Sequence, residues 1–245
     1  MLPINHSALY LWRRIDRVAI NRSSVWRKRP VKVSVKKVAE HRAALIATAM
    51  RLLQERGFAG AGVAEISREA GLTQGALYGQ FKSKDALAKE AACKALADGA
   101  ASWRELREVV PDPLSAYLDA YLCESHVKNT GSGCLIAACV SEVARLDETI
   151  GTAFADGFQD LVALIENALP EGTPKQVVRR RALTLISAMV GSVAMARALQ
   201  KTDPKLSREI IAAARVELGH LAISDNRGAE RASRLRGRKG PTPAR

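Results

Sequence analysis

Apolar residues recur at helical spacing along most of the chain between residues 38 and 222. In the first such segment, residues 38–56, the side chains of Leu45 and Leu52 fall on one face, and Gly57 is expected to end the helix. A longer segment without proline begins after Ser83 and reaches about residue 108. Its length predicts a helical rod that joins two domains.

Between these two helices, residues 62–84 predict a short helix, a tight turn and a second short helix. One face of the first short helix is apolar: Val63, Ile66 and Ala70. Gly71 permits the left-handed backbone that ends a helix, and Thr73 is a suitable N-cap for the next one. This pattern is typical of a helix-turn-helix, with residues 74–80 as the recognition helix.

The predicted recognition helix has an outer face that suits a DNA groove. Leu77 and Phe81 anchor it to the core. Its other side chains are small, amide or aromatic, without a carboxylate: Gln74, Gly75, Ala76, Tyr78 and Gln80. A helix that faces only solvent usually carries charges of both signs. A helix that enters a DNA groove should carry no negative charge, because the DNA phosphates would repel it. The face therefore predicts DNA recognition.

The rest of the chain predicts further helices. Three of them begin with a capping side chain before a proline at the first helical position: Asp112-Pro113, Thr173-Pro174 and Asp203-Pro204. A short apolar helix is expected from Cys134 to Val143, and another opens at Asp147. The last two helices, near 175–200 and 204–222, are apolar and rich in small residues, which fits either the pairing of two subunits or a core within one chain.

The net charge of +13 lies at the two ends of the chain. Residues 1–42 hold 11 basic and 2 acidic residues, residues 227–245 hold 7 and 1, and the region between has 20 and 22. Basic arms attract phosphates without sequence preference, although a solvated tail without a partner is the favoured interpretation of the C-terminal one. We expect disorder in residues 1–37 and 223–245. Because Val31 to Lys37 looks like a protein start, a start codon placed too far upstream would explain the leader.

Composition favours an all-α protein, because 47% of residues are hydrophobic but only 4% aromatic. The four cysteines form no C-x-x-C pair and the four histidines are scattered, so we expect no metal site and no cofactor. We see no signal peptide and no apolar run of membrane-spanning length, which makes a reducing cytoplasm the simplest location.

The region from Ile46 to Leu87 resembles the TetR/AcrR family of transcriptional regulators. The resemblance covers a three-helix unit with its turn and exit, which is more specific than one short motif. It rests on these segments: Glu55-Arg56-Gly57-Phe58, Val63-Ala64-Glu65-Ile66, Ala70-Gly71-Leu72-Thr73, Gly75-Ala76-Leu77-Tyr78 and Phe81-Lys82-Ser83-Lys84-Asp85-Ala86-Leu87. Gly133-Cys134-Leu135 also resembles one branch of the family. Ala61 and Gly62 depart from the Thr or Ser of many members, and Gln80 from their His.

The resemblance implies an all-α homodimer, with a helix-turn-helix DNA-binding domain at 38–84 and a ligand-binding and dimerisation domain at 85–222. It implies a repressor that binds a palindromic operator in double-stranded DNA and is released by a small-molecule inducer. Gln74 would contact a base edge, since its amide suits adenine. The implied DNA contacts are Thr73, Gln74, Gly75, Ala76, Tyr78, Gly79, Gln80, Lys82 and Lys84.

Candidates for an inducer pocket are side chains of the second domain that suit a moderately apolar ligand: Trp103, Tyr117, Tyr121, His126, Cys139, Phe154, Phe158 and Met189. Each of them is also compatible with ordinary core packing. The alternative function is a thiol-based redox or electrophile sensor that uses Cys134, Cys139 or Cys123, although free cysteines are more often small buried hydrophobes. No catalytic motif is present, so we do not expect an enzyme.

Overall fold

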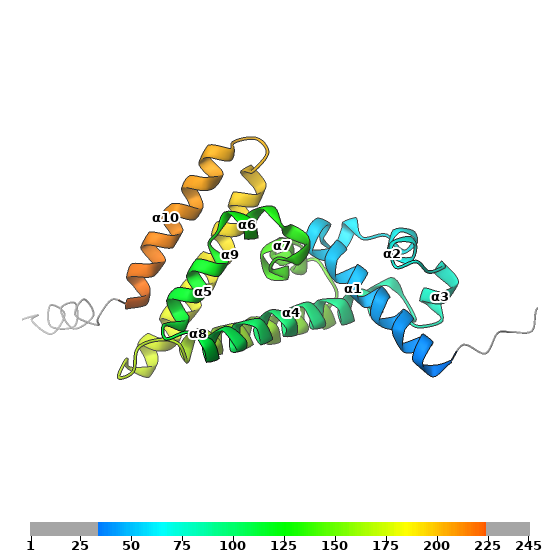
Figure 1. The fold of residues 1–245 in the computed structure, drawn as a ribbon, viewed down its shortest axis with the longest axis horizontal. Helices are drawn as coiled ribbons and strands as arrows, with labels where there is room; N and C mark the ends of the chain where they lie inside the picture. Colours follow the sequence, from blue (N-terminus) through cyan, green and yellow to red (C-terminus); the bar gives the residue numbers. More distant parts are fainter. Residues whose placement is uncertain (1–33, 224–245) are drawn as a thin grey trace, which may run out of the picture.

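The computed structural model describes residues 34–223, and their regular secondary structure is helical throughout. Figure 1 shows one group of helices at one end, a larger group at the other, and α4 extending from the first group along the second. The helices are α1 (Val35–Gly60), α2 (Val63–Glu69), α3 (Gln74–Tyr78), α4 (Lys84–Val109), α5 (Pro113–Tyr121), α6 (Glu124–Lys128), α7 (Leu135–Val143), α8 (Glu148–Glu166), α9 (Lys175–Leu199) and α10 (Pro204–Ile223), with a 3-10 turn at Thr130–Ser132. The all-α prediction is confirmed, while most of the expected leader and tail lies outside the described residues.

α1 starts three residues before the expected position, because the hydroxyl of Ser34 accepts a hydrogen bond from the N–H of Lys37 at 3.3 Å and caps it. Gly57 has a φ of 73°, which interrupts the helix where the sequence predicts its end. One further turn follows, and Phe58 returns to the core with 6% of its surface exposed. The kink therefore turns the end of α1 inward.

The turn between α2 and α3 forms as predicted. Gly71 has a φ of 68°. The hydroxyl of Thr73 accepts a hydrogen bond from the N–H of Ala76 at 3.2 Å and caps α3. α3 ends at Tyr78, two residues before the predicted end, and Leu77 is its fully buried anchor. Gly62 occupies the N-cap of α2 without a side-chain bond, as its residue type requires.

α4 connects the two parts of the molecule, in agreement with the predicted rod. Ser83 caps it by accepting a hydrogen bond from the N–H of Ala86 at 3.0 Å. Its apolar face is lined with alanines and packs against α1 near its start and against α8 further along. Small side chains allow these helices to approach closely. A displacement of α4 would therefore reach both parts.

Two of the three predicted Pro-containing caps are confirmed. Asp112 accepts from the N–H of Ser115, and Asp203 accepts from the N–H of Leu206, both at 3.0 Å. The prediction for Thr173 is wrong: its hydroxyl donates to the carbonyl of Pro170 at 2.8 Å, so it closes the preceding loop instead of capping α9.

The expectation that no apolar run reaches membrane-spanning length is wrong. α9 contains an apolar stretch that is long enough, by length and composition, to cross a membrane. In this fold the helix is the centre of the larger group and packs against α7, α8 and α10. Leu185, Met189 and Val193 are fully buried on its inner face. The apolar composition is that of a core helix whose opposite face carries exposed Leu183 and Met195.

Candidate nucleic-acid interface and effector cavity

The α1–α3 unit exposes the face that the sequence predicts to bind DNA. The side chains at the start of α3 are exposed, and Tyr78 is 55% exposed although it is aromatic. Ala76 is half-buried. Of the predicted contacts, the exposed ones are Thr73, Gln74, Gly75, Tyr78, Gly79 and Lys82. This surface can enter a groove because it is small at its leading end and contains no acid.

Two of the predicted contacts already have partners within the protein. The ammonium of Lys84 donates to the carbonyl of Phe58 at 3.1 Å and ties the start of α4 to the end of α1. The amide of Gln80 donates to the carbonyl of Val38 at 3.4 Å. Both side chains are half-buried. They position the α1–α3 unit, and phosphate contact from either would have to coexist with these bonds.

The structure adds basic residues of α1 that sequence analysis did not select. Arg42 donates to the carbonyl of Gln80 at 3.0 Å, pairs with Glu90 and lies over the ring of Phe81. It thereby holds the end of α3 against α1. The first turns of α1, which Figure 1 shows beside α3, carry exposed Lys36 and Lys37. Only the position of α1 relative to α3 identifies them as candidates for phosphate contact.

Three acids of α1 and α2, namely Glu55, Glu65 and Glu69, pair with arginines of α1, whereas Glu40 is exposed near the start of α1. Glu65 accepts from Arg56 at 2.7 Å, and this bond lowers the pKa of the Glu65 carboxyl. Glu69 pairs with Arg51. These pairs lie on α1 and α2 rather than on the outer face of α3. The exposed face of α3 thus remains free of negative charge.

A cavity of about 220 Å³ lies in the larger part of the molecule, between α4, α5, α6, α7 and α8. Trp103, Tyr121 and His126 line it, and all three are candidate ligand residues from the sequence. Trp103 stacks on Tyr117 with ring centroids 4.6 Å apart and meets the edge of Tyr121 at 6.1 Å. The wall also includes Cys134, at the N-cap of α7. Three of these lining residues are ligand candidates from the sequence and Cys134 is a thiol candidate, whereas Ser132 and Gly133 of the loop before α7 are not among the ligand candidates.

His126 holds the loop that begins α7. Its Nδ1 donates to the carbonyl of Tyr121 at 2.7 Å, and its Nε2 accepts from the N–H of Cys134 at 3.0 Å. This pair of bonds requires a neutral imidazole. Burial lowers the pKa of His126, and the nearby Arg197 guanidinium lowers it further. His126 is therefore a neutral clamp in the cavity wall.

The other predicted ligand residues line none of the described cavities. Tyr117 donates its hydroxyl to the carbonyl of Trp103 at 2.6 Å and is 1% exposed. Met189 is fully buried, and Phe154 packs on Phe58 with centroids 6.3 Å apart. The thiol of Cys139 donates to the carbonyl of Leu53 at 3.4 Å. Together with half-buried Phe158, these side chains belong to the core around the cavity.

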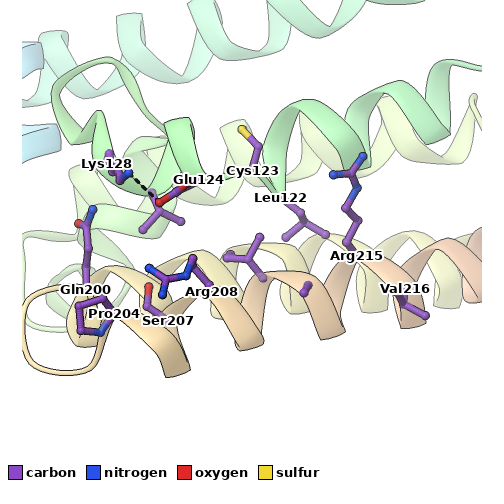
Figure 2. A pocket seen from close by; sticks show the side chains of 13 residues that line it. Leu122, Cys123, Glu124, Lys128, Gln200, Pro204, Ser207, Arg208, Arg215 and Val216 are labelled. Atoms are coloured by element: carbon purple, nitrogen blue, oxygen red, sulfur yellow. Dashed lines mark ion pairs between the residues drawn. The ribbon is translucent and has the colours of Figure 1, made fainter.

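A larger open groove of about 670 Å³ separates α5 and α6 from α10 (Figure 2). Its floor is apolar and includes Leu122 and Ile211. Its rim is charged: Lys128 pairs with Glu124 at 2.7 Å, and Arg208 extends along α10. No buried polar atom without a partner is found among its described lining residues. In this respect it differs from the smaller cavity, where the buried hydroxyl of the lining residue Tyr121 has no hydrogen bond of normal geometry.

α7 joins the cavity directly to the α1–α3 unit. At its start, the amide of Gln54 donates to the carbonyl of Gly133 at 2.6 Å. At its end, Oε2 of Glu142 accepts from the N–H groups of Phe58 and Ala59 at 2.9 and 3.3 Å. These N–H groups follow the kink at Gly57, where a Cβ would overlap the Glu142 carboxylate. One short helix thus has its first turn in the cavity wall and its last turn on the end of α1.

The cysteines differ in what their surroundings allow. Burial raises the pKa of Cys139 to about 12, which keeps it a thiol. Cys123 is half-buried and bonds locally to the carbonyl of Ala120 at 3.2 Å. Cys134 is half-buried, lines the cavity and lies near the guanidinium of Arg197. Of the three, Cys134 is the one in the wall of the smaller cavity.

Comparison with known proteins gives two family matches. The model described as bacterial regulatory proteins, tetR family, matches residues 45–91. The model of the LmrA/YxaF-like transcriptional regulator C-terminal domain matches residues 113–208. Together they cover more than half of the chain. The first match contains α3 and the second contains the loop before α7.

Individual relatives agree with these matches. The HTH-type transcriptional repressor NemR of Escherichia coli strain K12 is 29% identical over 139 residues, which are 52% of this chain and 66% of NemR. The chain thus spans just under two thirds of that relative. The regulator LmrA of Bacillus subtilis strain 168 is 23% identical over 68% of this chain and 92% of LmrA. The crystal structure of E. coli NemR in its reduced form has a TM-score of 0.63 and 25% identity, covering 73% of this chain and 95% of that one.

Proposed function

Because the chain belongs to the TetR family of transcriptional regulators, we propose that it is a repressor that binds a palindromic operator as a homodimer and is released by a small molecule. We assign residues 38–84 to DNA binding, and residues 85–222 to effector binding and dimerisation. The observation that carries the proposal is the exposed, acid-free face of α3. It is held on a unit matched to the family's DNA-binding model.

In this proposal the residues of α3 divide into two roles. Gln74 and Ala76 choose the site through base edges, because amide and methyl groups match adenine and thymine. Tyr78 and Lys82 contact phosphates and set the register. Lys36 and Lys37 extend the phosphate contacts along α1. Gln80 and Lys84 act by positioning the helices, given their bonds to Val38 and Phe58.

The dimer is proposed to form through α9 and α10. The outer face of α9 carries an uncharged stripe of Leu183, Ser187, Gly191 and Met195. Its small residues let another helix approach closely. Two subunits related by a two-fold axis would present their α3 helices to half-sites separated by one DNA turn, roughly 34–36 Å, or more.

Selection of bound DNA from a random pool tests this function. The full chain should enrich sequences with a two-fold repeat, and the enriched DNA should bind the protein at least about a thousandfold more tightly than shuffled DNA. Enrichment of no palindrome, or binding of all sequences with equal affinity, would contradict the proposal.

The effector is proposed to bind in the cavity lined by Trp103, Tyr121 and His126. An effector acts only if it binds the DNA-free conformation more tightly, and complete release requires about 5 kcal/mol of difference. α7 offers the shortest connection, because Cys134 lies in the cavity wall and Glu142 caps the end of α1. α4 offers a second connection, since it packs against α1 and borders the cavity.

A second candidate function is thiol sensing at Cys134, favoured by its place in the cavity near Arg197. One solved structure of the relative NemR is of its reduced form. Modification of Cys134 would add bulk at the start of α7 and displace it.

The thiol function is tested by treating the protein–DNA complex with N-ethylmaleimide. Release of DNA by the wild type but not by Cys134→Ser supports it, with Cys93→Ser as a control because Cys93 is exposed on α4. Equal release from all three proteins, or no release from any of them, argues for a non-covalent effector.

A further inference from the structure

We propose that the effector of this protein is a small carboxylate, held with its charged group at the start of α7 and its apolar body against Trp103. The inference rests on the proposed effector cavity and specifies its ligand. Three features lie next to one end of the cavity: the guanidinium of Arg197, which lies against Gly133 of the wall, the buried hydroxyl of the lining residue Tyr121, and the start of α7.

Arg197 supplies a positive charge behind the cavity wall. Its Nη2 donates to the carbonyl of His126 at 2.9 Å, while its Nε and Nη1 are buried without a partner. A Cβ at Gly133 would overlap Nη2, so the guanidinium lies directly against the loop before α7. The ionisable groups around it are the hydroxyl of Tyr121, the thiols of Cys134 and Cys139 and the neutral imidazole of His126, and none is a carboxylate.

A buried cation without a counter-charge is costly. Burial accordingly lowers the pKa of the Arg197 guanidinium, because it disfavours the charged form. Among the described residues, the ion pairs include none with Arg197. An anion bound in the cavity would supply the missing charge.

Tyr121 and the start of α7 place further donors next to the cavity. Tyr121 lines the cavity and is only 8% exposed; its buried hydroxyl makes no hydrogen bond of normal geometry, and the Cys134 thiol, a weak hydrogen-bonding group, is its neighbour. Burial raises the pKa of Tyr121 well above the ordinary value, so it remains a donor at neutral pH. α7 starts at Leu135, and its N-cap, Cys134, provides no side-chain acceptor. The first N–H groups of a helix without such a cap favour an anion.

The rest of the cavity is suited to a flat apolar body. Its lining includes the rings of Trp103 and Tyr121 and the side chains of Leu96 and Leu161, with no aspartate or glutamate. The volume of about 220 Å³ is below the usual range for drug-sized ligands, which favours a molecule with one ring or a short chain. A small aromatic or aliphatic monocarboxylate matches both the positively charged end of the cavity and its apolar part.

Matched acid and amide pairs test the proposal on the full chain without DNA. Benzoate and benzamide, phenylacetate and phenylacetamide, and hexanoate and hexanamide have the same shape within each pair but differ in charge. Calorimetric titration at constant ionic strength should show at least one acid binding about tenfold or more tighter than its amide. If no acid binds more tightly than its amide, the proposal is overturned.

Variants locate the site. Tyr121→Phe removes only the hydroxyl, so acid affinity should fall about three- to tenfold while the melting temperature stays the same or rises. Arg197→Gln should abolish the preference for acid over amide. Arg208→Gln is the matched control, since Arg208 lines the larger groove, and it should change nothing. Loss of acid binding in Arg208→Gln, with no effect of Tyr121→Phe, would place the anion in the groove and contradict the proposal.

The same pairs added to the protein–DNA complex separate this inference from the proposed function. Acids that bind selectively but leave the DNA bound would support the anion site and contradict its role in induction. A neutral compound that releases DNA, with acids and amides bound equally, would support induction and contradict the anion site.

Discussion

Gln74 is the side chain whose placement most directly determines DNA sequence preference. It is exposed at the first position of α3, directly after the Thr73 cap. The cap fixes the helix start, and small Gly75 leaves room for the backbone to approach the bases. Tyr78 lies one turn further on and is exposed despite its ring.

Replacing Gln74 with alanine should therefore weaken binding to the selected operator by about 1–3 kcal/mol and relax the preference at one base pair of each half-site. Gln159→Ala is a suitable control, because Gln159 is exposed on α8, in the part of the molecule away from α3. Fluorescence anisotropy with operator and single-base variants measures both effects. An unchanged base preference in Gln74→Ala would show that another residue reads the site.

We predict that the folded protein loses stability in acid because of His126. Its pKa is lowered in the folded protein, so the unfolded chain takes up a proton at higher pH than the folded one does. Stability is then fully present above the ordinary pKa of about 6.5, declines as pH falls below it, and levels off below the lowered pKa. Thermal unfolding between pH 8 and pH 5 should show a steeper decline in the wild type than in His126→Asn. Parallel curves would contradict the neutral clamp.

For single residues, the helix caps could be predicted from the sequence, whereas side-chain bonds between residues far apart in the sequence could not. Thr73 and Ser83 cap helices as expected, because a cap bonds to a residue three positions away. The bond from Lys84 to Phe58 spans 26 positions, and that from Gln80 to Val38 spans 42. Such partners depend on how the helices pack, so two lysines of similar sequence context, Lys82 and Lys84, acquire different roles.

Among the helices, α7 has the most direct connection between the two sites. Its first residues border the cavity, and Glu142 near its end accepts two N–H groups of α1. The helix is only nine residues long, so a displacement at one end reaches the other. The absence of a side chain at Gly57 makes this contact possible, because a Cβ there would overlap the Glu142 carboxylate.

Glu142→Ala should lower the free energy of unfolding by about 2 kcal/mol, since it leaves two N–H groups without their acceptor. Glu142→Gln retains an oxygen and should cost roughly half as much. Chemical denaturation measures both values. Equal stability of all three proteins would show that the contact contributes nothing.

A double-mutant cycle isolates the fit at the kink. Gly57→Ala combines an unfavourable positive φ with a clash against Glu142, so part of its cost should disappear in the Glu142→Ala background. Additive costs would mean that the backbone conformation alone accounts for the glycine.

Helix positions could be predicted more fully than the cavity. α4 and α8 begin at their predicted caps, and α10 spans nearly its predicted range, because periodicity and capping are local signals. The cavity is formed by residues of α4, α5, α6, α7 and α8 and by a loop whose glycine, Gly133, packs on Arg197 from α9. No local signal marks Arg197, which lies 64 positions from Gly133 and follows the uncharged stretch 182–196 of α9.

For the whole molecule, the exposed apolar face of α9 is the main evidence for pairing of two subunits. The membrane-like composition of this helix follows from having a core on one side and a proposed partner on the other. Sequence alone left subunit pairing and an internal core as alternatives. The fold assigns Leu185 and Met189 to the internal core and leaves Leu183 and Met195 exposed for the proposed partner.

Met195→Glu should convert the dimer to a monomer and abolish tight operator binding, because it places a charge in the proposed interface. The helical content should not change, since Met195 is 55% exposed. Val109→Glu is the control, because Val109 is 77% exposed at the end of α4. Light scattering after gel filtration measures the mass. A wild-type monomer, or a Met195→Glu dimer, would exclude this interface.

The most direct test of the whole account is an anisotropy titration of the selected palindrome at several salt concentrations, together with DNA in which one half-site is scrambled. The account predicts two protomers per palindrome, a steep loss of affinity with salt, and much weaker binding to the single half-site at every salt concentration. Equal affinity for the palindrome and the half-site DNA, or binding that does not depend on salt, would contradict recognition by a two-fold pair of α3 helices.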